Sequence, residues 1–140
     1  MKNVITVLLV FLFGLIFPGF VQAGPVGDIK STLTTTRQQT MSMLSEDDRA
    51  VLEMRYDDAL KSSKDLDGLL AAALKNKSLL PAQPTLIQFK AVWEEFKKTR
   101  DVEIIPMLFA GDRLKARLTA FTTQAPRFKK MNELLESLPQ

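Results

Sequence analysis

The apolar residues of this chain recur at intervals that alternate between four and three over long stretches. The spacing holds from Leu52 to Ala73 and again from Leu86 to Phe96. It places the side chains on one face of an α-helix and is typical of the seam between packed helices. No stretch alternates with period two over a useful length, so strands are not expected. The chain is therefore predicted to be all-α.

Four helices are expected, separated by residues that disfavour helix. The segment LLPAQPT, which contains Pro81 and Pro84, is the clearest connection. Gly111 is a predicted C-terminal stop and Asp112 the following N-cap. The apolar series of the first two helices are out of phase near Ser45, which predicts a break there. The helices are expected to span about residues 28–44, 46–76, 85–110 and 112–138.

The same spacing predicts which residues face the core. In the first helix they are Ile29, Leu33, Thr36, Thr40 and Met43. In the second they are Leu52, Tyr56, Ala59, Ser63, Leu66, Leu70 and Ala73. In the third they are Leu86, Phe89, Trp93, Phe96, Arg100, Glu103 and Met107. In the fourth they are Leu114, Leu118, Phe121, Ala125, Phe128, Leu135 and Leu138, with Met131 on an adjacent face.

Two prolines lie within these predicted helices. A proline removes the hydrogen bond to the carbonyl four residues back, and its ring crowds that turn. Pro106 comes about one helical turn before Gly111, where a kink costs little. The apolar spacing of the fourth helix continues across Pro126, which predicts a kink there and not a chain reversal. Four helices with short connections favour an antiparallel, up-down-up-down four-helix bundle over residues 24–140.

The first 23 residues are predicted to be a signal peptide. Lys2 precedes an almost wholly apolar run, residues 4–17, of a length that suits a signal peptide and is short for a membrane span. Small or modest residues before position 24 predict cleavage after Ala23. The alternative is an uncleaved membrane anchor. With the signal removed, no remaining apolar run is long enough to span a membrane, so a periplasmic or secreted protein is expected.

The side-chain inventory excludes several kinds of chemistry. Cysteine and histidine are absent, which argues against the usual zinc sites, haem ligation and triads with a histidine base. No cofactor is expected, and no arrangement of nucleophile and base supports an enzyme. Removing Lys2 leaves 18 basic residues against 16 acidic ones. Such a balance argues against nucleic acid as a partner, because a clustered basic face would be expected.

Four residues are candidates for ligand binding: Tyr56, Trp93, Arg100 and Arg37. Tyr56 and Trp93 fit core packing, although their polar atoms would also suit a pocket wall. Arg100 and Glu103 occupy seam positions, where charged residues are rarely buried unless paired. They could form an ion pair between helices, or both could be exposed. Alternatively, Arg100 could bind a carboxylate. Arg37, Arg49 and Arg113 could converge with it only if the bundle ends meet.

Residues 89–120 resemble the second half of the periplasmic four-helix-bundle sensor domain of bacterial methyl-accepting chemotaxis receptors. The resemblance rests on Trp93, Phe96, Arg100, Pro106, Ala110 and Gly111. It implies a sensor bundle that recognises small molecules or partner proteins, usually at a dimer interface. In such receptors the first and fourth helices continue into membrane spans. Here the first apolar segment is predicted to be cleaved and no second span follows, so signalling across a membrane by this chain alone is not expected.

The sequence thus favours an exported, non-enzymatic, sensor-like bundle that binds a small ligand or a receptor protein. The alternative is a structural or interaction protein that dimerises through helix faces without a small ligand.

Overall fold

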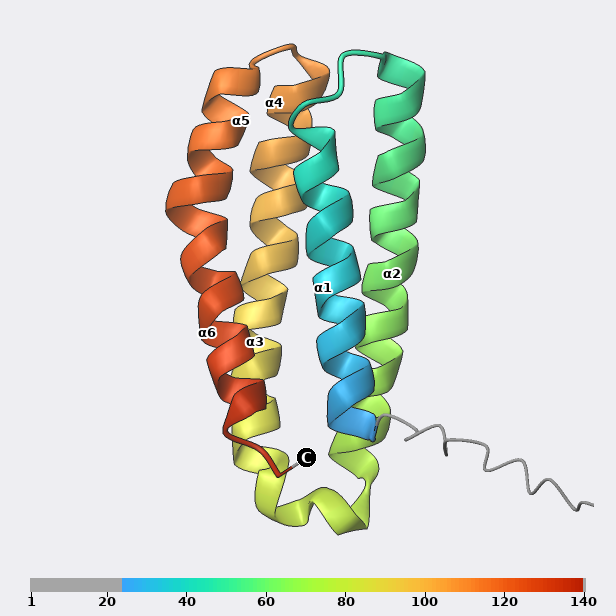
Figure 1. The fold of residues 1–140 in the computed structure, drawn as a ribbon, viewed down its shortest axis with the longest axis vertical. Coiled ribbons are helices and arrows are strands. Elements are labelled where there is room, and N and C mark those ends of the chain that lie inside the picture. Colours follow the sequence, from blue (N-terminus) through green and yellow to red (C-terminus); the bar gives the residue numbers. More distant parts are fainter. Residues whose placement is uncertain (1–23, 140) are drawn as a thin grey trace, which may run out of the picture.

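The computed structural model describes residues 24–139, and every secondary-structure element in this range is helical. The prediction of an all-α chain with four helices is confirmed (Figure 1). The predicted signal peptide lies outside the described residues. The first two helices are α1 (Pro25–Met43) and α2 (Arg49–Lys75). The third helix consists of α3 (Gln83–Thr99), the π-helix η2 (Arg100–Ile104) and α4 (Ile105–Phe109). The fourth consists of α5 (Arg113–Thr119), the π-helix η3 (Ala120–Gln124) and α6 (Ala125–Glu136).

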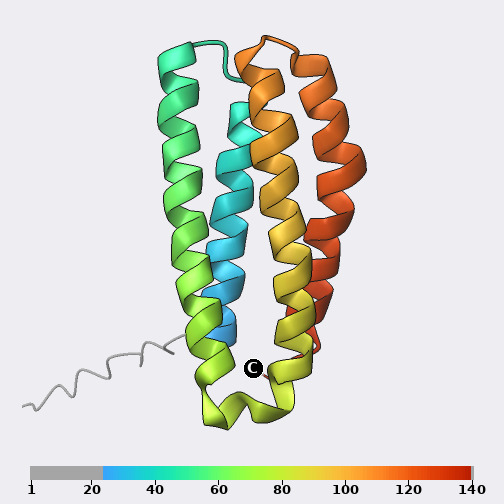
Figure 2. The same ribbon diagram turned by 180° about the vertical axis from the view of Figure 1, so that it is seen from behind.

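The four helices lie side by side and are connected at alternate ends (Figures 1 and 2). The α1–α2 loop and the turn between α4 and α5 lie at one end. The 3-10 helix η1 (Lys77–Ala82) connects α2 to α3 at the other. None of the helices in residues 24–139 is long and apolar enough to cross a membrane.

Local capping explains where two of the helices begin. The Oδ1 atom of Asp48 accepts hydrogen bonds from the backbone N–H groups of Ala50 (2.8 Å) and Val51 (3.1 Å). These bonds satisfy two N–H groups that have no partner within the helix. The second helix therefore begins at Arg49, three residues later than predicted. Asp112 caps α5 in the same way, as predicted.

Gly111 and Gly68 provide a matched pair of substitutions with effects of opposite sign. Gly111 has a φ of 80°, which costs a non-glycine residue about 1 kcal/mol or more. Gly68 lies inside α2, where alanine is more stable than glycine by about 0.5–1 kcal/mol. A Cβ atom at either position would meet no other atom within 4 Å, so only the backbone term differs. We expect Gly111→Ala to lower, and Gly68→Ala to raise, the free energy of unfolding measured with urea. Equal effects of the two changes would contradict this expectation.

Each π-helix lies directly before one of the two prolines. In η2 the N–H of Ile105 donates to the carbonyl of Arg100, five residues back, and Pro106 follows. In η3 the N–H of Ala125 donates to the carbonyl of Ala120, and Pro126 follows. A π turn is wider than an α turn and gives the proline ring space that a regular turn lacks. The chain accommodates both prolines by widening one turn, and the fourth helix continues past Pro126 as predicted.

The extra residue in each π turn shifts the helical register, and several predicted core positions are wrong for this reason. In the third helix the predicted core residues before the π turn are buried: Leu86, Phe89, Trp93, Phe96 and Arg100. After it, the core positions predicted for Glu103 and Met107 are taken by Ile104 and Leu108. Glu103 is exposed and Met107 is only partly buried. This shift is favourable, because it exchanges a carboxylate for aliphatic side chains in the core.

The shift in the fourth helix has the opposite effect on the apolar residues. The predicted core residues Leu114, Leu118 and Phe121 are 81%, 61% and 59% exposed. The buried residues of this segment are Ala116, Ala120 and Gln124. Beyond η3 the prediction holds for Leu135 and Leu138, while Ala125 and Phe128 are partly buried.

Two arginines on α5 stabilise this orientation. The Nη2 atom of Arg113 donates to the backbone carbonyl of Glu46 at 2.7 Å. The Nε atom of Arg117 donates to the carbonyl of Leu44 at 3.1 Å. These carbonyls belong to the loop that follows α1, where backbone acceptors lack helical partners. A regular helix with Leu114 and Leu118 turned inward would move both arginines away from the loop.

Candidate functional site

Arg100 is part of a buried polar network between α2 and η2. It is 1% exposed, and each of its three guanidinium nitrogens has a protein partner. Nε and Nη2 donate to the two carboxylate oxygens of Asp101 at 2.7 and 3.2 Å. Nη1 donates to the hydroxyl of Ser63 on α2 at 2.7 Å. Of the alternatives that the sequence left open, an ion pair is observed, but its partner is the next residue in the chain and not Glu103.

Tyr56 joins the same network from α2. Its hydroxyl donates to Oδ1 of Asp101 at 3.3 Å, so Asp101 connects Tyr56 to Arg100. Burial, and then the negative charge of Asp101, raise the pKa of Tyr56 above its usual value of 10.0. Arg100 opposes this shift in the pKa, but burial and Asp101 outweigh it. Each guanidinium nitrogen of Arg100 already donates one hydrogen bond, and the side chain is 1% exposed, so a ligand from solvent does not reach it.

The raised pKa of Tyr56 predicts a measurable titration. Tyr56 is the only tyrosine, so ultraviolet absorbance of the phenolate reports this group alone. We expect its pKa to lie above 10.0 in the folded protein and to fall in Asp101→Asn, because the nearby negative charge is removed. The native state holds this proton more tightly, so its contribution to stability is full below pH 10.0 and is lost as pH rises through the folded-state pKa. A titration midpoint unchanged by Asp101→Asn would contradict the proposed cause.

Trp93 lies in a core cluster that also contains Leu66, Phe89 and Phe96. Its ring is fully buried and stacks on Phe96, with ring centroids 5.7 Å apart. Its Nε1 donates to Oδ1 of Asp67 at 2.7 Å. Lys97 donates to the same carboxylate at 2.8 and 2.9 Å. The indole is thus enclosed by protein and has its polar partner on α2.

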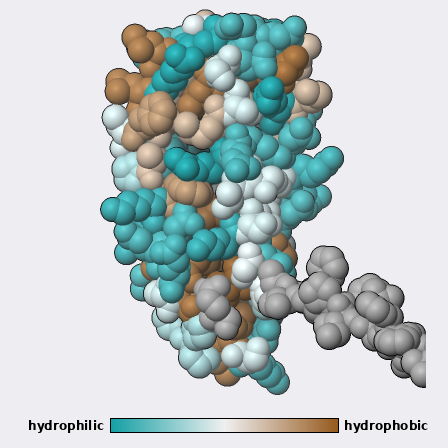
Figure 3. All heavy atoms as spheres, in the orientation of Figure 1, coloured by the Kyte–Doolittle hydropathy of each residue, from teal (hydrophilic) through white to brown (hydrophobic). Residues whose placement is uncertain are grey.

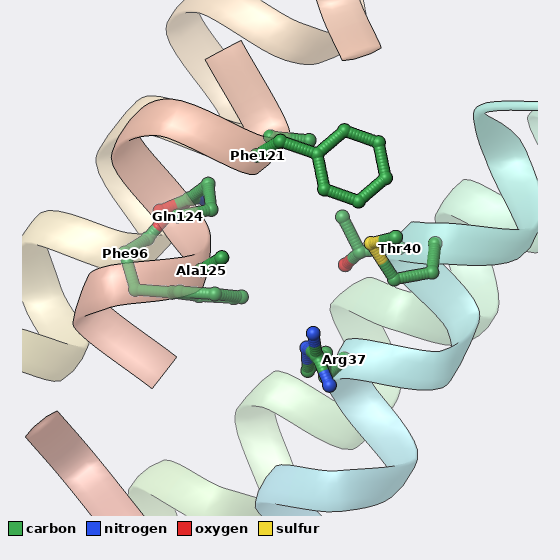
Figure 4. A pocket seen from close by; sticks show the side chains of 8 residues that line it. Arg37, Thr40, Phe96, Phe121, Gln124 and Ala125 are labelled. Atoms are coloured by element: carbon green, nitrogen blue, oxygen red, sulfur yellow. Dashed lines mark hydrogen bonds between the residues drawn. The ribbon is translucent and has the colours of Figure 1, made fainter. Parts of the chain in front are cut away.

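Arg37 has a different environment from the other three candidates. It lies on α1 beside a cleft that separates α1 from η3 and α6 (Figure 4). Its guanidinium carbon lies 4.2 Å from the centroid of the Phe128 ring. No carboxylate within residues 24–139 lies at ion-pair distance from it. Arg37 is therefore a positioned, partly exposed cation whose N–H groups are available to a ligand.

The walls of the cleft are mainly apolar. Besides Arg37, the lining residues are Thr40, Met41, Phe96, Ala120, Phe121, Gln124 and Ala125. The enclosed volume is about 10 Å³, about that of one water molecule. Gln124 donates from Nε2 to the carbonyl of Phe96 at 2.8 Å, and no donor in the described chain reaches its buried Oε1. An unpartnered buried acceptor costs about 1–3 kcal/mol, so a donor that reached Oε1 would be favourable.

The structure brings together only two of the four predicted site residues. Tyr56 and Arg100 share Asp101, Trp93 lies in a separate core region, and Arg37 lies in the cleft. Asp101, Phe121 and Gln124 were not among the candidates. Phe121 and Gln124 are brought to the cleft by the π turn, which the apolar spacing of the sequence does not reveal.

Comparisons with known protein families, with curated proteins and with solved structures gave no match to this chain.

Proposed function

We propose that this protein is an exported, non-enzymatic, sensor-like bundle with antiparallel, up-down-up-down topology. It binds a ligand that carries a carboxylate, and the binding site is the cleft between α1 and the fourth helix. The carboxylate belongs to a small molecule or to a side chain of a receptor or partner protein. The observation that carries the proposal is the position of Arg37 beside the cleft, with its guanidinium carbon 4.2 Å over the Phe128 ring and with no carboxylate partner in residues 24–139.

The geometry of Arg37 favours a carboxylate over other groups. The N–H groups of Arg37 have no hydrogen-bond partner in residues 24–139, and the planar guanidinium matches the two oxygens of a carboxylate. The exposed ring of Phe121 offers an apolar surface on the same cleft. Pockets that enclose whole small molecules usually have volumes of about 300–1,000 Å³, far more than this cleft. A carboxylate is itself larger than one water molecule, so the ligand rests at the mouth of the cleft.

Two further observations support the sensor-like class. Residues 89–120 resemble chemoreceptor sensor domains, and the helices are connected at alternate ends, as an up-down-up-down bundle requires (Figure 1).

The test uses Arg37→Ala with Arg49→Ala as a matched control. Arg49 also lies over an aromatic ring, that of Phe109 at 5.3 Å, but already pairs with Glu53 at 3.1 Å. Amino acids and dicarboxylic acids are screened by thermal shift, and a responding compound is titrated by calorimetry. We expect Arg37→Ala to abolish binding and Arg49→Ala to retain it. Absence of a responding carboxylate, together with absence of a captured partner from a periplasmic extract, would refute the proposal.

The alternative function is self-association through helix faces without a small ligand. The exposed side chains of Leu114, Leu118 and Phe121 favour it, because large apolar residues grouped on a surface often mark an interface. Light scattering at increasing protein concentration decides the matter, since a strict monomer at high concentration would exclude this alternative.

A further inference from the structure

The outward face of the fourth helix carries an apolar stripe formed by Leu114, Leu118 and Phe121. Residues at these intervals lie on one side of a helix, and all three are more than half exposed. In Figure 3, hydrophobic residues gather at the upper left, over α5. The stripe lies on a convex helix surface, so its side chains project from the molecule.

The segments around this stripe contain basic residues but no acidic ones. Residues 29–45, in and just after α1, and residues 113–132 of the fourth helix hold eight lysines and arginines and no aspartate or glutamate. Carboxylates just outside these two ranges reach the same side, because Asp112 pairs with Lys115, Glu133 with Lys129 and Glu136 with Lys30. Several of these cations pair with carboxylates from other segments, as Arg113 does with Asp47. Those without a carboxylate at ion-pair distance in residues 24–139 are Arg37, Arg117 and Lys130.

We propose that this face docks onto the surface of an anionic lipid bilayer. The apolar stripe enters the boundary between headgroups and acyl chains, while the surrounding cations contact the headgroups. Each Lys or Arg near an anionic surface strengthens binding by about fivefold. The docked protein lies on its side, with the fourth helix parallel to the membrane plane.

The composition of the face favours a bilayer over a protein. Lysine is depleted at protein–protein interfaces, whereas Lys115, Lys129 and Lys130 all belong to this segment. A convex stripe needs a matching groove on a protein partner but inserts into a bilayer without one. A second copy of the chain would present the same three cations that lack a carboxylate partner in residues 24–139, so like charges would oppose self-docking.

The experiment measures co-sedimentation with vesicles of phosphatidylcholine alone and of phosphatidylcholine mixed with phosphatidylglycerol. We expect at least tenfold stronger binding to the anionic vesicles at low salt, and loss of this preference at about 1 M salt, where the Debye length is about 3 Å. The intact protein is used. All variants share the same first 23 residues, so any contribution from them cancels in the comparison.

Two matched pairs of variants locate the contact. Leu118→Ser removes a stripe residue that is 61% exposed, and Ile87→Ser removes one that is 59% exposed on α3. We expect Leu118→Ser to weaken binding by about tenfold and Ile87→Ser to leave it unchanged. Lys130→Glu and Lys64→Glu make the same change in net charge on α6 and α2. Only Lys130→Glu is expected to weaken binding by about fivefold or more.

Three outcomes would overturn the docking proposal: equal binding to both vesicle types, equal effects of Leu118→Ser and Ile87→Ser, or equal effects of the two lysine variants. If binding to the two vesicle types were equal, the partner of this face would be an acidic protein and not an anionic bilayer. Circular dichroism confirms that each variant is folded. Carboxylate binding at Arg37 is measured without lipid and does not involve Leu118, so this proposal and the proposed function can fail independently.

Discussion

Trp93→Ala is expected to lower the free energy of unfolding by about 4 kcal/mol, the largest effect of any change considered for this protein. The indole is fully buried, stacks on Phe96 and donates a hydrogen bond to Asp67. Alanine would leave a cavity in a close-packed region and would remove this donor. Urea unfolding followed by circular dichroism at equilibrium gives the change directly.

Trp93→Phe separates the loss of volume from the loss of the hydrogen bond. Phenylalanine keeps most of the buried ring, and Lys97 still pairs with Asp67 at 2.8 Å, so the carboxylate retains a partner. We therefore expect a cost of about 1–2 kcal/mol for this variant. If Trp93→Ala cost no more than Trp93→Phe, packing of the indole would not be the main source of its contribution.

Arg100→Ala is expected to lower the free energy of unfolding by about 3 kcal/mol. The substitution leaves Asp101 without its bidentate partner and Ser63 without its donor, and it opens space where a long side chain was buried. Asp101 is partly exposed, so water moderates the cost of its lost partner, which places the effect at the lower end of the range for buried pairs.

Two comparisons identify the origin of the Arg100 effect. Lys98 is two residues earlier and exposed, so Lys98→Ala should change stability by no more than about 0.5 kcal/mol. Arg100→Met retains much of the buried volume but not the charge, and should cost less than Arg100→Ala. An Arg100→Ala effect as small as that of Lys98→Ala would mean that the buried network does not stabilise the fold.

The first two helices could be predicted closely from the sequence. Every predicted inner residue of α1 is buried, and so is every one of α2 except Tyr56, which is partly exposed. These helices have no internal proline, so a constant period of about 3.6 residues applies along their whole length. The spacing of the apolar residues then suffices to identify the buried face.

The core residues of the third helix could be predicted up to its π turn, and those of the fourth helix mainly beyond its π turn. Pro106 and Pro126 predicted a local irregularity in each helix. A kink and a π turn both satisfy the steric requirement of a proline, so the sequence could not distinguish them. Only a π turn changes the register. As a result Ile104 and Leu108 replaced Glu103 and Met107 in the core, and Leu114 and its neighbours were turned outward.

The candidate site was predictable in part. Arg37 was singled out as a potential ligand contact, and the structure places it beside a cleft without a carboxylate partner in the described chain. Arg100 was singled out for the same chemistry, yet it is 1% exposed and already paired with Asp101 and Ser63. Sequence spacing indicates that an arginine faces other helices, but only the positions of those helices decide whether it meets a partner.

The sequence by itself determined the helical class, the number of helices and the turn at Gly111, because these depend on local propensity and on the residues that disfavour helix. The tertiary structure decided which residues of α5 face the core. Arg113 and Arg117 bind the carbonyls after α1, and this orientation holds Ala116 and Ala120 inward. The physical reason is that a π turn lets one helix present two different faces before and after it, and the choice between them depends on contacts with residues far away in the chain.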